Sequence, residues 1–220
     1  EIYTLSLHDA LPIFGRRTLF LFLLLFFPSV PAVAGGLDLM FVDLADYDRS
    51  VVLDIHYAST NNFSGTKLYP AERCLLRRDA AMRLLKVQAK LRKMGYRLVV
   101  FDCYRPVSLQ KRFRALLPDQ RDPANGSRHN RGTAVAVWLA DSSGRALPMP
   151  TAYGDFSAKA KRSWNGVSPE AHKYSLMLES VMKEEGFVPF ADAWWHYDLA
   201  DWERYPVSDF PLEKSGGCEE

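Results

Sequence analysis

Apolar stripes at helical spacing and short apolar runs divide the chain into predicted helices and strands. Over residues 79–94 apolar side chains recur every three or four positions, and Gly95 follows. The apolar side chains are Leu84, Val87, Leu91 and Met94. This spacing predicts a helix with one buried face, because glycine is common just beyond a helix end.

A second helix is predicted over residues 168–185, with an apolar face and a glycine after it. Its first residues, Ser168 and Pro169, are the types preferred at the helix cap and at the first helical position. A shorter helix is predicted over residues 108–117, where a proline closes it.

Apolar runs without helical spacing predict strands. Their ranges are 51–57, 97–103, 133–139, 187–190 and 194–197. Residues 58–70, 119–132 and 141–167 are polar or rich in turn formers and are predicted to be loops. Helices and strands follow one another without regular strand–helix–strand repeats, so we predict an α+β fold. We expect a single domain with a small, mostly antiparallel sheet flanked by helices.

The composition is that of an ordinary globular protein. The 220 residues are 48% hydrophobic and 25% charged, and the formal net charge is +2 with mixed signs. Proteins that bind nucleic acid present a concentrated basic surface, so we expect no nucleic-acid partner.

Residues 15–34 have the pattern of a secretory signal peptide. Arg16 and Arg17 precede the apolar run 18–27, and small residues suited to cleavage follow. An uncleaved membrane anchor is the alternative, but the run is shorter than the roughly 17–25 residues that span a bilayer. We therefore expect an exported protein, periplasmic or extracellular, with no stable membrane span after cleavage.

The segments on either side of the signal complete the expected domain organisation. Residues 1–14 fit no part of a signal and resemble a translated sequencing adapter, so we treat them as a non-native leader. Residues 35–220 remain as the single folded domain.

The chain has three cysteines, and export implies a compartment in which disulfide bonds persist. Cys74 precedes a predicted helix and Cys103 ends a predicted strand, which makes them a candidate pair. Cys218 would then be left over in a polar tail. Three unpaired thiols are the alternative, because the sequence gives no distances between sulfur atoms.

Four polar segments lie where predicted strands end or loops return, the usual location of functional side chains. They are residues 104–106, 127–132, 155–156 and 194–197. Two of them contain histidines, His129 and His196. A zinc site for hydrolysis needs three protein ligands, an open position for water, and a base that takes the proton of that water.

These motifs resemble those of the zinc D-alanyl-D-alanine dipeptidases, a peptidase family that also holds D,D-carboxypeptidases. The matching segments, in the family's order, are Asp54–Ala58, Asn61–Gly65, Phe101–Pro106, Ser127–Ala134 and Gly186–Tyr197. The resemblance covers nearly the whole expected domain. It implies a fold like that of D,D-peptidases and hedgehog proteins, a zinc cofactor, and D-Ala-D-Ala or a related dipeptide as the partner.

The chain departs from the family pattern at two positions. The family has S-x-H-x-x-G-x-A-x-D, and Ala136 stands where the resemblance places the third zinc ligand, beside His129 and His196. The family has E-W-W-H or E-x-W-H, and Ala193 stands where it places the general base. Methyl groups neither bind zinc nor transfer protons, so we expect weak or absent zinc binding. We expect lost or severely impaired activity, because acid–base catalysis alone contributes ~10²–10⁴-fold.

Three nearby carboxylates are candidate substitutes for the missing acids. Side chains alternate along an extended segment, so we expect Asp192 to point away from the face of position 193, and Asp198 to share the face of His196. Asp141 lies on the opposite parity to position 136. We expect none of them to restore the site, because metal–ligand distances vary by only about 0.2 Å.

The remaining motif residues have roles that the resemblance implies. Arg105 is expected to stabilise the developing oxyanion, with a structural ion pair to Asp102 as the alternative. Ser127 and Asp155 are assigned to the termini of the substrate, with loop capping as the alternative for Asp155.

The sequence therefore predicts an exported dipeptidase scaffold of cell-wall metabolism that has lost its chemistry. A non-catalytic binding module for peptidoglycan-derived peptides and an interaction domain without a ligand are the alternatives.

Overall fold

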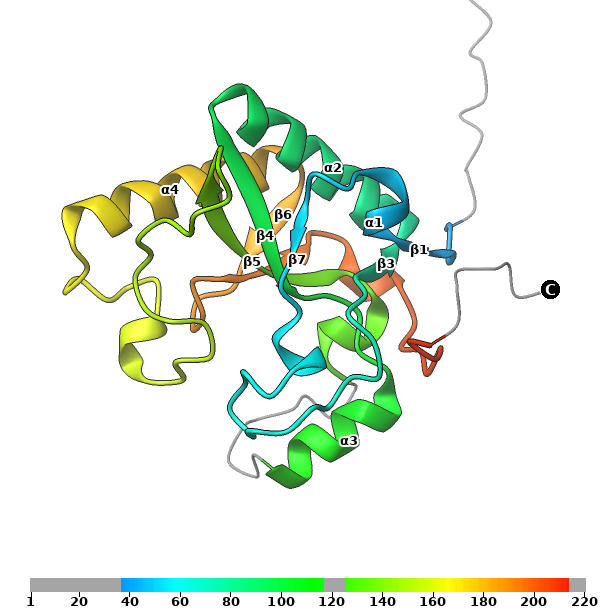
Figure 1. Cartoon of the computed structure of the whole chain (residues 1–220). Helices are drawn as coiled ribbons and strands as arrows, with labels where there is room; N and C mark the ends of the chain where they lie inside the picture. The colour runs from blue at the N-terminus through cyan, green and yellow to red at the C-terminus, as the bar shows by residue number, and fades with distance from the viewer. Residues whose placement is uncertain (1–36, 117–125, 214–220) are drawn as a thin grey trace, which may run out of the picture. The chain divides into compact units, whose positions relative to one another are not determined.

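The computed structural model of the chain describes residues 37–116 and 126–213 (Figure 1). The predicted leader and signal peptide, residues 1–34, lie outside the described residues, as does Cys218. In the described part of the chain, no helix is both long and apolar enough to cross a membrane.

A five-stranded sheet forms the centre of the domain, with strand order β2-β4-β5-β7-β6. Its strands are β2 (Val52–Leu53), β4 (Tyr96–Asp102), β5 (Ala134–Asp141), β6 (Phe187–Pro189) and β7 (His196–Leu199). Only the β2–β4 pair is parallel, and the other three pairs are antiparallel. A second, two-stranded antiparallel sheet joins β1 (Phe41–Asp43) to β3 (Leu75–Arg77). The predicted α+β fold with a mostly antiparallel sheet is thus confirmed.

Four α-helices and four short 3₁₀ segments accompany the sheets in the described residues. The α-helices are α1 (Leu44–Tyr47), α2 (Arg78–Lys93), α3 (Val107–Leu116) and α4 (Pro169–Glu184). The 3₁₀ segments are η1 (His56–Ala58), η2 (Arg128–Arg131), η3 (Ala158–Ala160) and η4 (Trp202–Arg204). In Figure 1, α2 and α4 lie beside the sheet, while α3 lies at the opposite end of β4 from the α2–β4 turn.

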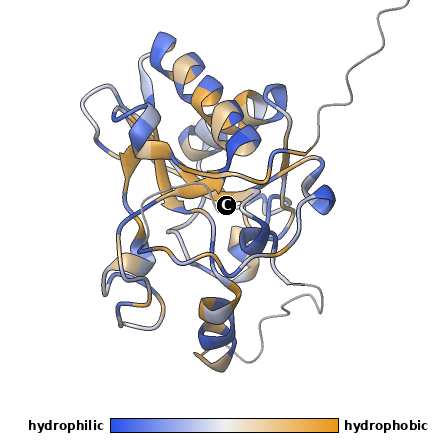
Figure 2. Cartoon of the chain, turned by 90° about the vertical axis from the view of Figure 1, so that its right-hand side faces the viewer, coloured by the Kyte–Doolittle hydropathy of each residue, from blue (hydrophilic) through white to orange (hydrophobic). Residues whose placement is uncertain are grey.

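The core lies between the long helices and the sheet. Leu84, Val87 and Leu91 of α2 are completely buried, as the apolar stripe predicts, whereas Met94 is exposed beyond the helix end. Fully burying one such side chain contributes roughly 1.5–3 kcal/mol. Figure 2 shows hydrophobic residues concentrated in the strands, while the helices carry both hydrophobic and hydrophilic residues.

A β-bulge in β4 determines on which face of the sheet the Asp102 side chain lies. Val100 pairs with Val137, but the next pair is Asp102 with Ala136, so Phe101 is an extra residue in the ladder. Without the bulge, Asp102 would share the face of Val100, because side chains alternate along a strand. With it, Asp102 turns to the same side as Ala136.

Several elements differ from the predictions because tertiary contacts override local pattern. The strand predicted over residues 51–57 shortens to β2 and is followed by η1. Trp194 and Trp195, predicted to be extended, lie in a turn that the His196 N–H to Ala193 carbonyl bond closes, so β7 begins only at His196. The strands β1 and β3 were not predicted, since three residues show no periodicity. Within the predicted loop 119–132, residues 128–131 form η2.

The candidate cysteine pair is confirmed. Cys74 and Cys103 form a disulfide with Cα atoms 5.2 Å apart, and both residues are buried. The bond ties the residue before β3 to the residue after β4, at the point where the chain turns towards Arg105.

Candidate metal centre and ligand pocket

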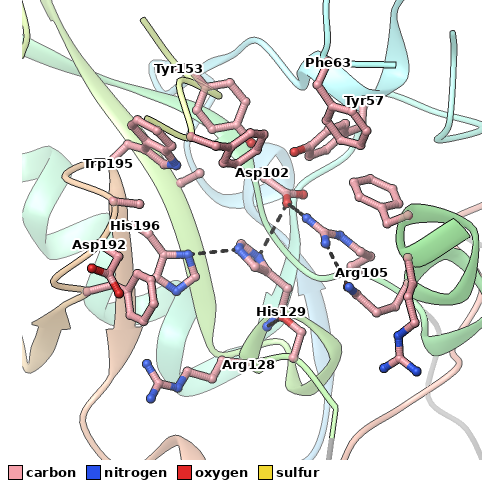
Figure 3. Close-up of a pocket in the computed structure, with 18 residues that line it drawn as sticks. Tyr57, Phe63, Asp102, Arg105, Arg128, His129, Tyr153, Asp192, Trp195 and His196 are labelled. Atoms are coloured by element: carbon pink, nitrogen blue, oxygen red, sulfur yellow. Dashed lines mark hydrogen bonds and ion pairs between the residues drawn. The ribbon is translucent and has the colours of Figure 1, made fainter. Parts of the chain in front are cut away.

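A cavity of about 610 Å³ opens on the face of the sheet to which the bulge turns Asp102 (Figure 3). Its lining includes two histidines, one arginine and two alanines singled out by the sequence. These are His129, His196, Arg105, Ala136 and Ala193. Segments far apart in the sequence therefore meet in one pocket, which is lined elsewhere largely by aromatic rings.

The segment η2 presents His129 to the pocket. Ser127 caps η2 by accepting from the His129 N–H at 3.2 Å, and the Ser127 N–H donates to the Asn130 side chain at 2.7 Å. Gly132 ends the segment in the left-handed region at φ 74°, and a Cβ there would lie 2.5 Å from the Phe41 ring. Capping box and glycine stop together fix the direction in which the imidazole points.

The two imidazoles face each other across the pocket. Nε2 of His129 lies 3.3 Å from Nδ1 of His196, as the dashed line in Figure 3 shows. The other nitrogen of His129, Nδ1, donates to the Cys103 carbonyl at 2.6 Å, because a carbonyl oxygen only accepts. Likewise Nε2 of His196 donates to the Asp198 carboxylate at 2.8 Å. Both facing nitrogens of the neutral rings therefore carry lone pairs, an arrangement that suits a shared cation.

Ala136 and Ala193 complete the wall around this pair. In the sheet, Ala136 lies directly between Asp102 of β4 and His196 of β7. A side chain at this position points to the same side as its cross-strand neighbours, so a longer acid there would reach the histidines. Ala193 lies in the turn before β7 and also lines the cavity. Within residues 37–116 and 126–213, no cluster of three or more His, Cys, Asp or Glu side chains is placed to hold a metal ion.

Two ion pairs, one buried and one partly buried, support the two sides of the pocket. Arg105 donates to Asp102 at 2.5 Å and to the Tyr69 hydroxyl at 3.1 Å, and its guanidinium stacks over the Phe113 ring. On the other side, Arg128 pairs with Asp198, the acceptor of the His196 ring. The structural ion pair with Asp102 thus exists, and the same guanidinium lines the pocket, so the two readings of Arg105 are compatible.

Burial and charge shift the titration of these groups. Burial lowers the pKa of His129 from 6.5 to about 4, because the desolvated ring holds a proton poorly. Burial alone would raise the pKa of Asp198, but His196 and Arg128 outweigh it and hold that pKa below its ordinary value. Asp198 is therefore ionised and able to accept from His196 at neutral pH.

Of the two residues assigned to the termini of the substrate, one lines the pocket and the other does not. Ser127 lines the pocket as well as capping η2. Asp155 accepts from the Ser157 N–H at 2.9 Å, a loop-capping contact, and is not among the residues that line this cavity. Its assignment to the substrate terminus stays a prediction.

The three carboxylates considered as substitutes for the missing acids are placed differently from one another. Asp192 was expected to point away from the face of position 193, and this was wrong: it lines the pocket, because residues 191–195 form a turn rather than an extended strand. Asp198 does share the face of His196, but it binds the ring nitrogen that points away from His129. Asp141 pairs with Arg145 instead.

Sequence reasoning missed the supporting roles of Arg128 and Tyr69, whereas the ion pair of Asp102 with Arg105 was among its alternatives. The alternation in β7 was a usable signal for Asp198, since residues two apart on a strand share a face. No local pattern could have indicated Tyr69 or Arg128, because their partners lie 33 and 70 residues away in the chain.

Comparison with known proteins shows which family the chain matches. A family model described as D-ala-D-ala dipeptidase matches residues 38–211. The D-alanyl-D-alanine dipeptidase of Escherichia coli is 32% identical over 169 residues, covering 76% of this chain and 88% of that protein. That of Enterococcus faecium is 27% identical over 203 residues, covering 80% of this chain and 100% of that protein.

Among solved structures, a D,D-peptidase aligns more loosely. It is a crystal structure of a variant of the vancomycin resistance D,D-pentapeptidase VanY in complex with Zn(II). The TM-score is 0.37 at 13% identity, over 61% of this chain and 78% of that chain.

Proposed function

Because the chain belongs to the D-Ala-D-Ala dipeptidase family, we propose that its pocket binds D-alanyl-D-alanine or a related cell-wall dipeptide. We propose further that hydrolysis is lost or severely impaired. The observation that carries this proposal is the pair Ala136 and Ala193, in a pocket that otherwise keeps the histidines and the arginine of the family pattern.

Zinc is the metal that the family resemblance implies, and the pocket fits only part of its coordination. Tetrahedral zinc with Zn–N bonds of ~2.0–2.1 Å holds two nitrogens about 3.3–3.4 Å apart. Nε2 of His129 and Nδ1 of His196 lie 3.3 Å apart, which matches one edge of such a site. The third protein ligand of a catalytic site is lacking at Ala136, so zinc is held weakly or not at all.

The missing base adds a second, independent loss. In the family pattern, a glutamate at position 193 takes a proton from water. Ala193 has no carboxylate that could do so. Asp192 lines the pocket next to it, but its side chain is 62% exposed and pairs with Lys161 at 3.3 Å. An exposed and already paired carboxylate is a poor substitute, because a general base must lie within hydrogen-bond reach of the reacting water.

The groups suited to holding a dipeptide are still present. Arg105 uses three acceptors within the protein, Asp102, Tyr69 and Gln110, and a guanidinium has more N–H donors than these take. Its remaining donors can bind a ligand carbonyl or carboxylate. Pocket walls of Tyr57, Tyr153 and Trp195 supply apolar contact for small side chains such as the methyl groups of D-alanine.

Restoring both acids tests the proposal. Ala136→Asp combined with Ala193→Glu should create hydrolysis of D-Ala-D-Ala, measured as released D-alanine in the presence of Zn²⁺. The matched control is Ala136→Asp with Ala193→Gln, which regains the ligand but not the base and should be ~10²–10⁴-fold slower. If the restored protein binds zinc yet leaves D-Ala-D-Ala intact, the substrate assignment is wrong.

A non-catalytic binding module is a second candidate function. The ion pairs Asp102–Arg105 and Asp198–Arg128 favour it, because they hold the walls of the pocket although both acids of the chemistry are gone. Calorimetry on the unaltered protein should then show binding of D-Ala-D-Ala without turnover, and no binding of L-Ala-L-Ala. Absence of any D-Ala-D-Ala binding would contradict both candidates.

Export to the periplasm or the extracellular space is part of the proposal. The charged, apolar and small-residue order of residues 16–35 supports it, as does the Cys74–Cys103 disulfide, since such bonds persist in oxidising compartments. Expression of the full chain in a bacterial host, followed by fractionation and N-terminal sequencing, should yield a secreted form that begins at Gly35. A protein found only in the cytoplasm with an intact N-terminus would refute export.

A further inference from the structure

We infer that Arg162 is a positioning residue, which holds in place the wall of the pocket formed by residues 190–196. The inference deepens the proposed function and rests on it, because this wall includes the position of the lost base and one of the two histidines. Arg162 itself is not among the residues that line the cavity, so it acts on a ligand only through the segment that it holds.

The segment 190–196 supplies one side of the pocket, although most of it is a turn. It connects β6 to the start of β7, and residues 191–195 belong to no strand. In Figure 3, Trp195 and His196 lie on one side of the pocket and Arg105 on the other. Main-chain groups in a turn lack the regular pairing of a strand, so their partners come from other segments. The cavity-lining residues of the segment are Phe190, Asp192, Ala193, Trp195 and His196.

The segment finds many of these partners in Arg162. Nε of Arg162 donates to the Phe190 carbonyl at 2.9 Å. Nη2 donates to the carbonyls of Trp194 at 2.7 Å and of His196 at 3.3 Å. The main-chain N–H of Arg162 donates to the Ala191 carbonyl at 2.9 Å. Carbonyls at both ends and in the middle of the turn therefore accept from a single residue.

The other side of the guanidinium ties this wall to α4. Nη1 donates to the Glu179 carboxylate at 2.8 Å and to the Tyr197 hydroxyl at 3.4 Å, and the guanidinium lies over the Tyr197 ring. An arginine side chain has five N–H donors, and five acceptors surround it here. Only 16% of the Arg162 side chain and 25% of the Glu179 side chain are exposed, so water competes weakly for these bonds.

A general contribution to stability is the alternative role for such a residue. Positioning is favoured because the residues between the held carbonyls are the ones that line the cavity. Among them, the Trp195 indole packs edge-on against Tyr153, with the ring centroids 5.5 Å apart. Lysine at position 162 would keep the positive charge, but its donors all lie on one nitrogen. It therefore cannot hold several carbonyls and a carboxylate as the planar fork of arginine does.

Fluorine NMR of the ligand-free protein reports the position of this wall. The chain has five tryptophans, and 5-fluorotryptophan at all of them gives signals that single Trp→Phe variants assign. In Arg162→Lys we expect the Trp195 signal to shift or broaden, because the indole loses its fixed distance to Tyr153. Glu179→Gln leaves a neutral acceptor for Arg162 and should change the same signal less. This second variant decides the question if Arg162→Lys does not fold.

Two control variants separate positioning from stability. Val87→Ala removes buried volume from α2 and should lower the melting temperature while leaving the Trp195 signal in place. Arg145→Lys, at a side chain that is 83% exposed, should change neither. Calorimetry with D-Ala-D-Ala is done at a temperature at which every variant is folded. Affinity should fall about 5–10-fold in Arg162→Lys, a factor of the size that one aromatic contact contributes, and stay unchanged in both controls.

A Trp195 signal that stays unchanged in Arg162→Lys and Glu179→Gln would overturn the inference. So would an equal shift of this signal in Val87→Ala, or an unaltered affinity for D-Ala-D-Ala in Arg162→Lys. Failure of the proposed function is a different result, in which the unaltered protein binds no D-Ala-D-Ala. The Trp195 signal of the ligand-free protein would then still decide whether Arg162 positions the wall.

Discussion

The buried ring of His129 should make the folded domain less stable in mild acid. Its pKa is about 4 in the fold, compared with 6.5 for the ordinary side chain, because burial disfavours the charged form. Between these two values the unfolded chain binds a proton that the folded chain does not. Stability is therefore intact above pH 6.5 and is lost progressively as the pH falls towards 4.

The size of this loss follows from the two pKa values. At pH 4 the unfolded ring is almost fully protonated while the folded ring is about half protonated, which corresponds to about 3 kcal/mol. Solvent screens this ring little, since only 6% of His129 is exposed. A loss of this size is a large fraction of the roughly 5–15 kcal/mol by which domains are stable.

Urea unfolding followed by tryptophan fluorescence between pH 4 and 7.5, with a chelator present, measures the effect. In the His129→Gln variant most of the loss over this range should disappear, because no titrating ring remains at that position. His172→Gln is the matched control, since His172 is exposed on α4 and its replacement should leave the pH profile unchanged. The reasoning is refuted if His129→Gln loses stability between pH 7 and pH 4 as steeply as the unaltered protein.

Two further predictions concern the Cys74–Cys103 disulfide and the guanidinium of Arg105. Replacing Cys74 and Cys103 by serine should lower the unfolding free energy by about 3–4 kcal/mol, the chain-entropy value for their separation of 29 residues, and reducing agent should then have no further effect. Arg105→Lys should weaken binding of D-Ala-D-Ala at least ~10-fold by calorimetry, because an ammonium cannot reproduce the planar fork of donors. Arg145→Lys, at an 83% exposed side chain, should leave that affinity unchanged, and equal effects of the two changes would contradict the role given to Arg105.

The long helices could be predicted because their signals are local. Ser168 caps α4 and Pro169 begins it, as the residue types indicated. The bounds of α2 lie within one residue of the prediction, since its apolar stripe, its first turn and Gly95 all lie within one stretch of chain. The short strands β1 and β3 gave no such signal, because each is stabilised by pairing with the other rather than by its own sequence.

The kinds of side chain in the pocket could be predicted from the sequence, but their arrangement in space could not. The motifs indicated His129, His196 and the two alanines, and the structure brings all four to one cavity. The expectation for Asp192 failed because side chains alternate only along a strand, and the segment before His196 is a turn. Asp102 points towards the pocket because of the β-bulge in β4. A bulge is defined by the pairing with the neighbouring strand, so the sequence of β4 alone does not show it.

The sequence by itself determined which groups this protein has and which it lacks: two imidazoles, one guanidinium, and methyl groups where the family pattern has acids. Residue types are fixed by the chain, and helix caps and periodicity act over a few neighbouring residues. Only the tertiary structure decided that His129 and His196, 67 residues apart, face each other at 3.3 Å. That distance comes from η2, which sets the direction of one ring, and from the pairing of β5 with β7, which puts His196 beside Ala136. Hydrogen bonds between strands join segments that have no local means of finding one another, so their register exists only in the folded protein.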